Sequence, residues 1–144
     1  MQVWRTSGSM DRLTRERRSA LMSRIRGKDT APEKTLRAAL HKAGYRYRIH
    51  VRSLPGCPDI VFPTRRKAIF VHGCFWHSHE KCRLGLLPKS KLSYWKPKLQ
   101  ANVRRDQRNI RKLRRQGWGV LVVWQCRLRK LDRSLSRIRW FLER

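Results

Sequence analysis

Apolar residues recur along this chain with helical spacing in some segments and strand spacing in others. Thr30 precedes a first-turn proline and Glu33, which can reach back to the cap, so a helix is expected from about position 31 to Gly44. Two later segments, 101–116 before Gly117 and 132–143, also have helical periodicity. The helix that begins near position 31 is expected to bury Leu36, Ala39, Leu40 and Ala43. The helix at 132–143 is expected to bury Leu135, Ile138, Phe141 and Leu142.

Strands are expected where apolar residues alternate or run together over a few positions. Residues 45–51 alternate like a half-buried strand, 59–62 and 67–72 form a pair joined by a turn, and 119–125 is a continuous apolar run. A loop that contains Pro88 and Pro97 should lead into the long helix. With a further helix before Thr30, the order α, α, β, β, β, α, β, α predicts an α/β fold, a mixed β-sheet flanked by helices.

The first residues of the chain are polar. Residues 1–10 lack apolar periodicity, so a disordered tail is expected there. Residues 11–27 predict a basic helix with a thin apolar stripe that includes Met22. The chain has 144 residues, 40% of them hydrophobic, which suits one core, and 11–144 is therefore expected to form a single domain.

The charge of the chain points to a polyanionic partner. Lys and Arg number 37 against 9 Asp and Glu, which gives a formal net charge of +28. Such a chain repels itself unless a polyanion neutralises it, so nucleic acid is the leading partner. No membrane partner is expected, because the longest apolar runs, such as 120–124, are too short to span a bilayer and no secretory signal is evident.

Metal ligands are densest in the segment Cys-Phe-Trp-His-Ser-His-Glu-Lys-Cys at 74–82. Two cysteines and one histidine with this spacing need one more ligand to close a tetrahedral zinc site, and a late cysteine can supply it. The spacing leaves open whether His77 or His79 is the ligand. A closed site would be structural, and zinc is favoured over disulfides, which indicates a reducing cytoplasm. The expected ligands are Cys74, His79, Cys82 and Cys126.

Asp59 begins one expected strand and His72 ends the next, so both side chains should lie at the same end of the sheet. A carboxylate there suits Mg²⁺, which usually keeps several waters and binds substrate phosphate. His77 lies five residues beyond His72, and an imidazole can take a proton from water. The alternative for Asp59 is a solvated residue at a strand start.

Other titratable residues have simpler explanations. Glu33 has a capping role, and Asp106 can pair with arginines at helical spacing, yet both are further candidates for the active site. His41 and His50 lack such neighbours in the sequence, and surface or packing roles are expected for them.

Three large rings, Phe75, Trp76 and Trp95, fall in segments that resemble loops. They could cover the metal-ligand segment at 74–82 as a small satellite core. Alternatively, they could insert between stacked bases of a nucleic acid and unstack them. Met22, on the expected basic helix, is ambiguous in the same way.

Five ordered blocks resemble the very-short-patch-repair (Vsr) DNA mismatch endonucleases, over about residues 12 to 130. They are Lys-Asp-Thr-Ala-Pro-Glu at 28–33, Leu-Pro-Gly-Cys-Pro-Asp at 54–59, Val-His-Gly-Cys-Phe-Trp-His at 71–77, Asn-Val-Arg-Arg-Asp at 102–106 and Val-Trp-Gln-Cys at 123–126. The resemblance implies a restriction-endonuclease-like nuclease with one structural zinc. Such an enzyme nicks duplex DNA 5′ of the T in a T:G mismatch left by deamination of 5-methylcytosine.

The resemblance also implies a role for each matching residue. Asp59 and the backbone carbonyl of Val71 would bind catalytic Mg²⁺, and His77 would transfer a proton to or from the attacking water. His72 would support the phosphate, Asp106 would orient the histidines and Glu33 would assist near the metal. The implied zinc ligands are Cys74, His79, Cys82 and Cys126. The implied DNA-contacting residues are Met22, Phe75, Trp76, Trp95 and Asn102.

The expected partners are double-stranded DNA with a T:G mismatch, mismatch-repair proteins and a repair polymerase, and the expected enzyme is a monomer that acts at the bacterial nucleoid. Two other functions fit parts of the sequence. A non-catalytic zinc-dependent DNA-binding module explains the charge and cysteines but leaves Asp59, His72 and His77 without a task. A related nicking nuclease with a different target keeps the chemistry and changes only the recognition.

Overall fold

A computed structural model describes residues 29–144 of the chain. The expected tail at 1–10, the expected basic helix at 11–27 and Met22 lie outside the described residues. No helix in the described part is long and apolar enough to cross a membrane.

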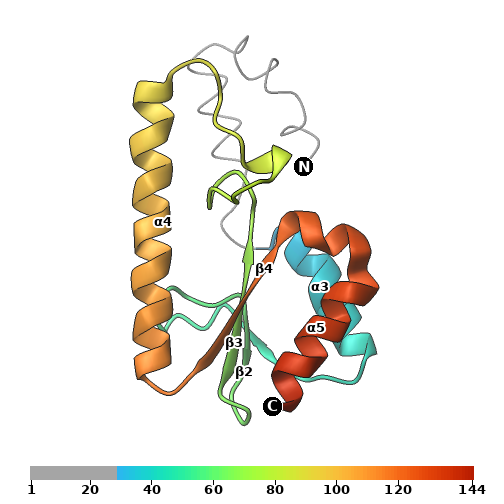
Figure 1. The fold of residues 1–144 in the computed structure, drawn as a ribbon. Coiled ribbons are helices and arrows are strands. Elements are labelled where there is room, and N and C mark those ends of the chain that lie inside the picture. Colours follow the sequence, from blue (N-terminus) through green and yellow to red (C-terminus); the bar gives the residue numbers. More distant parts are fainter. Residues whose placement is uncertain (1–28) are drawn as a thin grey trace.

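A four-stranded sheet in the order β1-β2-β3-β4 forms the centre of the structure (Figure 1). Its strands are β1 (Arg48–Ile49), β2 (Ile60–Phe62), β3 (Lys67–His72) and β4 (Gly119–Trp124). The first three strands pair antiparallel, whereas β3 and β4 pair parallel, so the expected mixed sheet is confirmed. A parallel pair needs a long crossover between its strands. Here the crossover includes the cysteine-rich loop, residues 74–82, and a helix.

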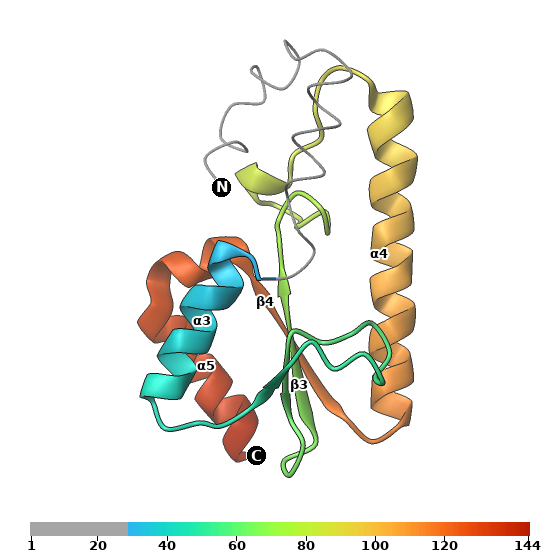
Figure 2. The same ribbon diagram turned by 180° about the vertical axis from the view of Figure 1, so that it is seen from behind.

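Helices cover both faces of the sheet, as Figures 1 and 2 show from opposite sides. Helix α4 (Leu92–Arg115) lies on one face, and α3 (Ala31–Lys42) and α5 (Leu131–Glu143) lie together on the other. Two short 3-10 helices complete the described elements, η2 (Arg83–Gly85) and η3 (Gln125–Lys130). The upper half of α4 extends beyond the sheet and lies beside the loop that follows β3.

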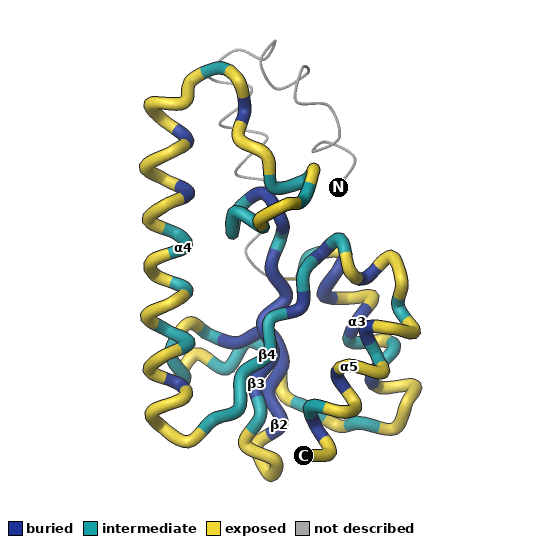
Figure 3. The backbone as a smooth tube through the Cα atoms, in the orientation of Figure 1, coloured by how far each residue is buried: buried dark blue, intermediate teal, exposed yellow. Residues whose placement is uncertain are grey.

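The main core lies between the sheet and the α3–α5 pair (Figure 3). Leu36 and Leu40 of α3 and Ile138 and Leu142 of α5 are buried against the strands, as their helical spacing predicts. Ala43, expected in the same face, is the C-cap of α3 and is exposed. The buried strand residues of this core are Ile60, Phe62, Ile69, Val71 and Val123.

Thr30 and Glu33 begin helix α3 in a variation of the expected capping box. The Thr30 hydroxyl accepts the backbone N–H of Glu33, but the Glu33 carboxylate accepts the N–H of Asp29, one residue earlier than a regular box. Glu33 is only 2% exposed. Its carboxylate is therefore held inside the protein, which a cap alone does not require.

The expected start of the long helix was wrong. Helix α4 begins at Leu92 rather than at 101, so Trp95 and Pro97 are helical and not in a loop. Pro97 removes one hydrogen bond close to the start of the helix. The burial of Trp95 and Leu99, four residues apart on one face, offsets that loss. The first strand is also shorter than expected, and Gln125 belongs to η3 rather than to β4.

Leu36→Ala should lower the free energy of unfolding by about 2–5 kcal/mol, because it leaves a cavity between α3 and the sheet. Urea denaturation followed by circular dichroism measures this change. Leu86→Ala is the matched control, since Leu86 is 68% exposed and its truncation should change stability by less than about 0.5 kcal/mol. Equal effects of the two substitutions would contradict the assigned core.

Candidate functional site

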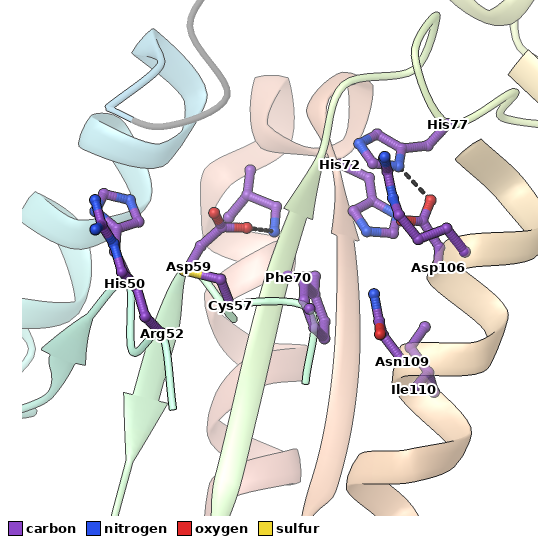
Figure 4. Close-up of a pocket in the computed structure, with 13 residues that line it drawn as sticks. His50, Arg52, Cys57, Asp59, Phe70, His72, His77, Asp106, Asn109 and Ile110 are labelled. Atoms are coloured by element: carbon purple, nitrogen blue, oxygen red, sulfur yellow. Dashed lines mark hydrogen bonds and ion pairs between the residues drawn. The ribbon is translucent and has the colours of Figure 1, made fainter. Parts of the chain in front are cut away.

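A pocket of about 530 Å³ lies between helix α4 and the strand ends of the sheet (Figure 4). Most of the catalytic residues implied by the sequence line this pocket together: Asp59, Val71, His72, His77 and Asp106. Glu33 does not line it but lies behind Asp59. The expectation that two neighbouring strands deliver a carboxylate and an imidazole to one end of the sheet is therefore met by the geometry.

Asp59, which directly precedes β2, is held by the backbone of β3. Its Oδ2 accepts the backbone N–H of Val71 at 2.7 Å. Because the N–H and C=O of one strand residue point to the same neighbour, the Val71 carbonyl also faces this edge. Burial, together with the nearby charge of Glu33, raises the pKa of Asp59 to about 7. A cation bound beside a buried carboxyl group of this kind would lower its pKa and favour loss of its proton.

His50 supports the same carboxylate pair from the end of β1. Its Nε2 lies 3.1 Å from Oε2 of Glu33, and its backbone N–H donates to the carbonyl of Asp59. Sequence reasoning gave His50 only a surface or packing role, so this contact was missed. The signal that could have found it is strand pairing: in the β1–β2 register Ile49 faces Ile60, which places His50 beside Asp59.

Two imidazoles stack on the opposite side of the pocket. The rings of His72 and His77 are 3.8 Å apart and nearly parallel. Nδ1 of His77 forms a hydrogen bond with Oδ2 of Asp106 from α4. An ionised carboxylate can only accept, so the proton is on Nδ1 and the lone pair of Nε2 is free to accept another. Burial, and Coulomb repulsion from His77 whenever that ring takes up a second proton, lower the pKa of His72 to about 3, so His72 is neutral at physiological pH.

Trp124 joins the histidine pair to the cysteine-rich loop. Its ring meets His72 edge-on, with centroids 5.3 Å apart, and stacks flat on His79 at 4.1 Å. A continuous series of ring contacts, two stacked and one edge-on, therefore runs from His79 through Trp124 and His72 to His77. Trp124 belongs to one of the five sequence blocks, but its contacts with both histidines depend on the parallel pairing of β3 and β4, which the block does not reveal.

The second cluster fits a tetrahedral metal site. Cys74, His79, Cys82 and Cys126 place one ligand atom each within 4.8 Å of one another. The separation of 3.4 Å between Cys126 Sγ and His79 Nδ1 suits two ligands bound to one zinc, about 2.3 and 2.1 Å from it. The cluster contains His79, whereas His77 faces Asp106. All four cysteines are free, so no disulfide competes.

The aromatic residues form a compact cluster. Phe75 and Trp95 are buried, Trp95 to 1% exposure, and they pack edge-to-face on each other. Trp76 is half-buried at the edge of this cluster, and Asn102 of α4 donates to its carbonyl. Lys98 lies over the ring of Trp76. The structure therefore contains the satellite core that was one of the two sequence interpretations.

Comparison with known proteins adds the function of relatives to this geometry. The family model for DNA mismatch endonuclease Vsr matches residues 10–83. The type II nicking enzyme V.XorIIP of Xanthomonas oryzae is 56% identical over 92% of this chain and 97% of its own length. The DNA mismatch endonuclease Vsr of Escherichia coli is 46% identical over 78% of this chain and 71% of its own length.

These similarities define the class of the protein as a DNA endonuclease, a hydrolase that cleaves DNA. The chain belongs to the Vsr family of DNA mismatch endonucleases. The resemblance seen in the sequence blocks is thus confirmed, and so is DNA as the molecule on which the protein acts.

Asp59→Asn should stabilise the magnesium-free protein increasingly as pH rises. In the unfolded chain Asp59 ionises near its usual 3.8, and in the folded protein near 7. Between these values the folded state binds more protons, so the contribution of Asp59 to stability falls as pH rises from about 4 to about 7. The stability difference between variant and wild type should grow by on the order of 3 kcal/mol across this window.

Urea denaturation at several pH values measures this difference. The opposing effect of neutral His72 is present in both proteins and cancels. Asp132→Asn, at an exposed position in the first turn of α5, is the matched control and should show no such trend. A pH-independent difference for Asp59→Asn would show that burial does not disfavour its charge.

Proposed function

We propose that this protein nicks duplex DNA on the 5′ side of the T in a T:G mismatch and thereby initiates very short patch repair of deaminated 5-methylcytosine. The observation that carries this proposal is a single pocket, in a chain of the Vsr family, with Asp59 on one side and the His77–Asp106 pair on the other. The fold is proposed to be restriction-endonuclease-like, a single domain over 11–144 that acts as a monomer.

Asp59 and the carbonyl of Val71 are proposed to hold Mg²⁺, with Glu33 close behind. Hard oxygen ligands suit this ion, which normally keeps several waters and takes substrate phosphate into its coordination sphere. The raised pKa of Asp59 supports the assignment, because a cation relieves the unfavourable charge of a buried carboxylate. When bound, Mg²⁺ would supply Lewis-acid stabilisation of the phosphate charge.

His77 is proposed to remove a proton from the attacking water at Nε2. Its hydrogen bond with Asp106 keeps the proton on Nδ1 and stabilises the imidazolium that forms. His72, buried and neutral, orients His77 through the stack and donates a hydrogen bond to the phosphate. Attack in line with the leaving oxygen leaves a 5′-phosphate and a 3′-hydroxyl.

Zinc is proposed to occupy the Cys74, His79, Cys82 and Cys126 cluster as a structural ion. Four protein ligands leave no open position, so this site would brace the loop and take no part in hydrolysis. Burial raises the pKa of the Cys74 thiol to about 12, and only a bound cation makes its thiolate favourable at neutral pH. Because His79 stacks on Trp124 and Trp124 contacts His72, a bound zinc would also help to fix the position of His72.

Recognition of the mismatch is proposed to use the aromatic cluster. Trp76, at its half-exposed edge, would enter the base stack from the major groove, with the buried rings of Phe75 and Trp95 behind it. A mismatched step is easier to unstack than a paired one, so the wedge would favour T:G. Asn102 fixes the backbone of Trp76. Contact of Met22 with the minor groove remains a prediction outside the described residues.

Cys126→Ala should reduce the zinc content of the purified protein to well below one ion per chain and lower the yield of folded protein. Removal of one thiolate opens the tetrahedron and weakens binding. Inductively coupled plasma mass spectrometry measures the metal-to-protein ratio. Cys57→Ala is the matched control, since Cys57 is a free cysteine outside the cluster. An unchanged ratio in Cys126→Ala would exclude it as a ligand.

His77→Ala should lower the rate of Mg²⁺-dependent nicking of a T:G duplex by about 100-fold or more while leaving mismatch binding intact, because it removes only the proton acceptor. Single-turnover cleavage on a denaturing gel and a binding titration separate the two effects. His41→Ala, on the exposed side of α3, is the matched histidine control. Retained cleavage by His77→Ala would refute its proposed role.

The same assay with wild-type protein tests the target. The T:G duplex should be nicked and its T:A counterpart should not. Equal cleavage of several mismatches would favour a nicking nuclease with a different target. Mismatch binding without cleavage at any Mg²⁺ concentration would favour the non-catalytic DNA-binding module.

A further inference from the structure

A second pocket, of about 630 Å³, lies at the cysteine-rich loop, and three of the proposed zinc ligands, His79, Cys82 and Cys126, are among its lining residues. Its walls come from that loop, from η3 and from α5. The basic residues that line it are Lys81, Arg127, Arg129, Lys130, Arg133 and Arg137. Glu80 is the one carboxylate among the lining residues.

Within the described part of the chain, the basic residues of this pocket form no ion pair, and Glu80 with the proposed thiolate ligands offsets only part of their charge. The ion pairs of arginine among residues 29–144 are Arg37 with Asp29 and Arg65 with Glu143, both elsewhere. Six cations that line one concavity repel each other, at a free-energy cost that an anion would remove. The basic lining therefore favours binding of an anion.

We infer that this basic pocket binds backbone phosphates of the DNA duplex that flank the cleavage site. Arginine guanidinium groups match phosphate oxygens with two parallel hydrogen bonds, and four of the six cations are arginines. Arg133 and Arg137 are four residues apart on α5, so they form a row about 6 Å long rather than one point. A row of this kind suits consecutive phosphates of a strand better than one small anion.

The position of the pocket supports the same occupant. His77 lines the active-site pocket and His79 lines the basic pocket, so two residues of chain, at most about 7 Å, separate the two walls. Trp124 contacts the histidines of both sides. For this occupant, a duplex with its scissile phosphate in the first pocket must extend around this loop, so that neighbouring phosphates lie in the second. Phosphate contacts position a protein without reading sequence, so this site contributes affinity and not mismatch selection.

The double variant Arg133→Ala/Arg137→Ala should weaken duplex binding by on the order of tenfold near 0.2 M salt. The slope of log affinity against log salt concentration should become shallower by about 2, because two phosphate contacts are lost. Fluorescence anisotropy with wild-type protein and variant, over a range of salt concentrations, measures both. T:G and T:A duplexes should lose affinity by the same factor, and the single-turnover nicking rate at saturating DNA should not change.

Arg111→Ala/Arg115→Ala is the matched control, since it removes the same charge at the same spacing from exposed positions on α4. It should change the salt slope by much less. Equal losses in the two double variants would show an effect of net charge alone and would overturn the inference, as would an unchanged slope in Arg133→Ala/Arg137→Ala. The result does not depend on T:G specificity, because it requires only that the protein binds duplex DNA.

Discussion

The parallel register of β3 and β4 is the constraint on which the site depends. It places His72 beside Trp124, and Trp124 in turn stacks on His79. Four rings are thereby fixed in sequence, with His77 at the end that faces the pocket. A shift of one residue in this register would turn every β4 side chain to the opposite face of the sheet and break the stack.

Two buried carboxylates stand out in a chain with a net charge of +28. Glu33 and Asp59 are both buried, and burial, together with the nearby charge of Glu33, raises the pKa of Asp59. Stability alone gives little reason to bury two neighbouring carboxylates, because burial of charge costs free energy that the hydrogen bonds from His50 and Val71 offset only in part. Their retention is understandable if a cation binds there during function. On the proposed function, this pair lowers local stability in exchange for the ability to bind a metal ion.

The sequence predicted the elements of the fold well where one local signal was strong. The capping residues around Thr30, the buried spacing of α5 and the pair β2–β3 with its turn were all recovered. The start of α4 was not, because Pro97 is a local signal for a loop and the burial of Trp95 against Phe75 is a tertiary effect that no local pattern shows. The convergence of Asp59 with His72 could be inferred, because it follows from the order of two neighbouring strands. The contact of His50 with Glu33 could not, because it depends on the β1–β2 register, which is again a tertiary feature.

Four histidines of this site illustrate why residue type alone does not define a role. His79 lies among thiols, His77 bonds a carboxylate on α4, His50 bonds the buried Glu33, and His72 packs against the rings of Phe70, His77 and Trp124. The same imidazole is accordingly suited to bind a soft metal, to accept a proton, to hold an acid in place, or to remain neutral. His77 and His79 are only two residues apart in sequence, yet their side chains serve different clusters, because the turns that follow β3 direct them apart. The different roles of His77 and His79 therefore depend on the backbone conformation of this loop, which the cysteines and Trp124 hold in place.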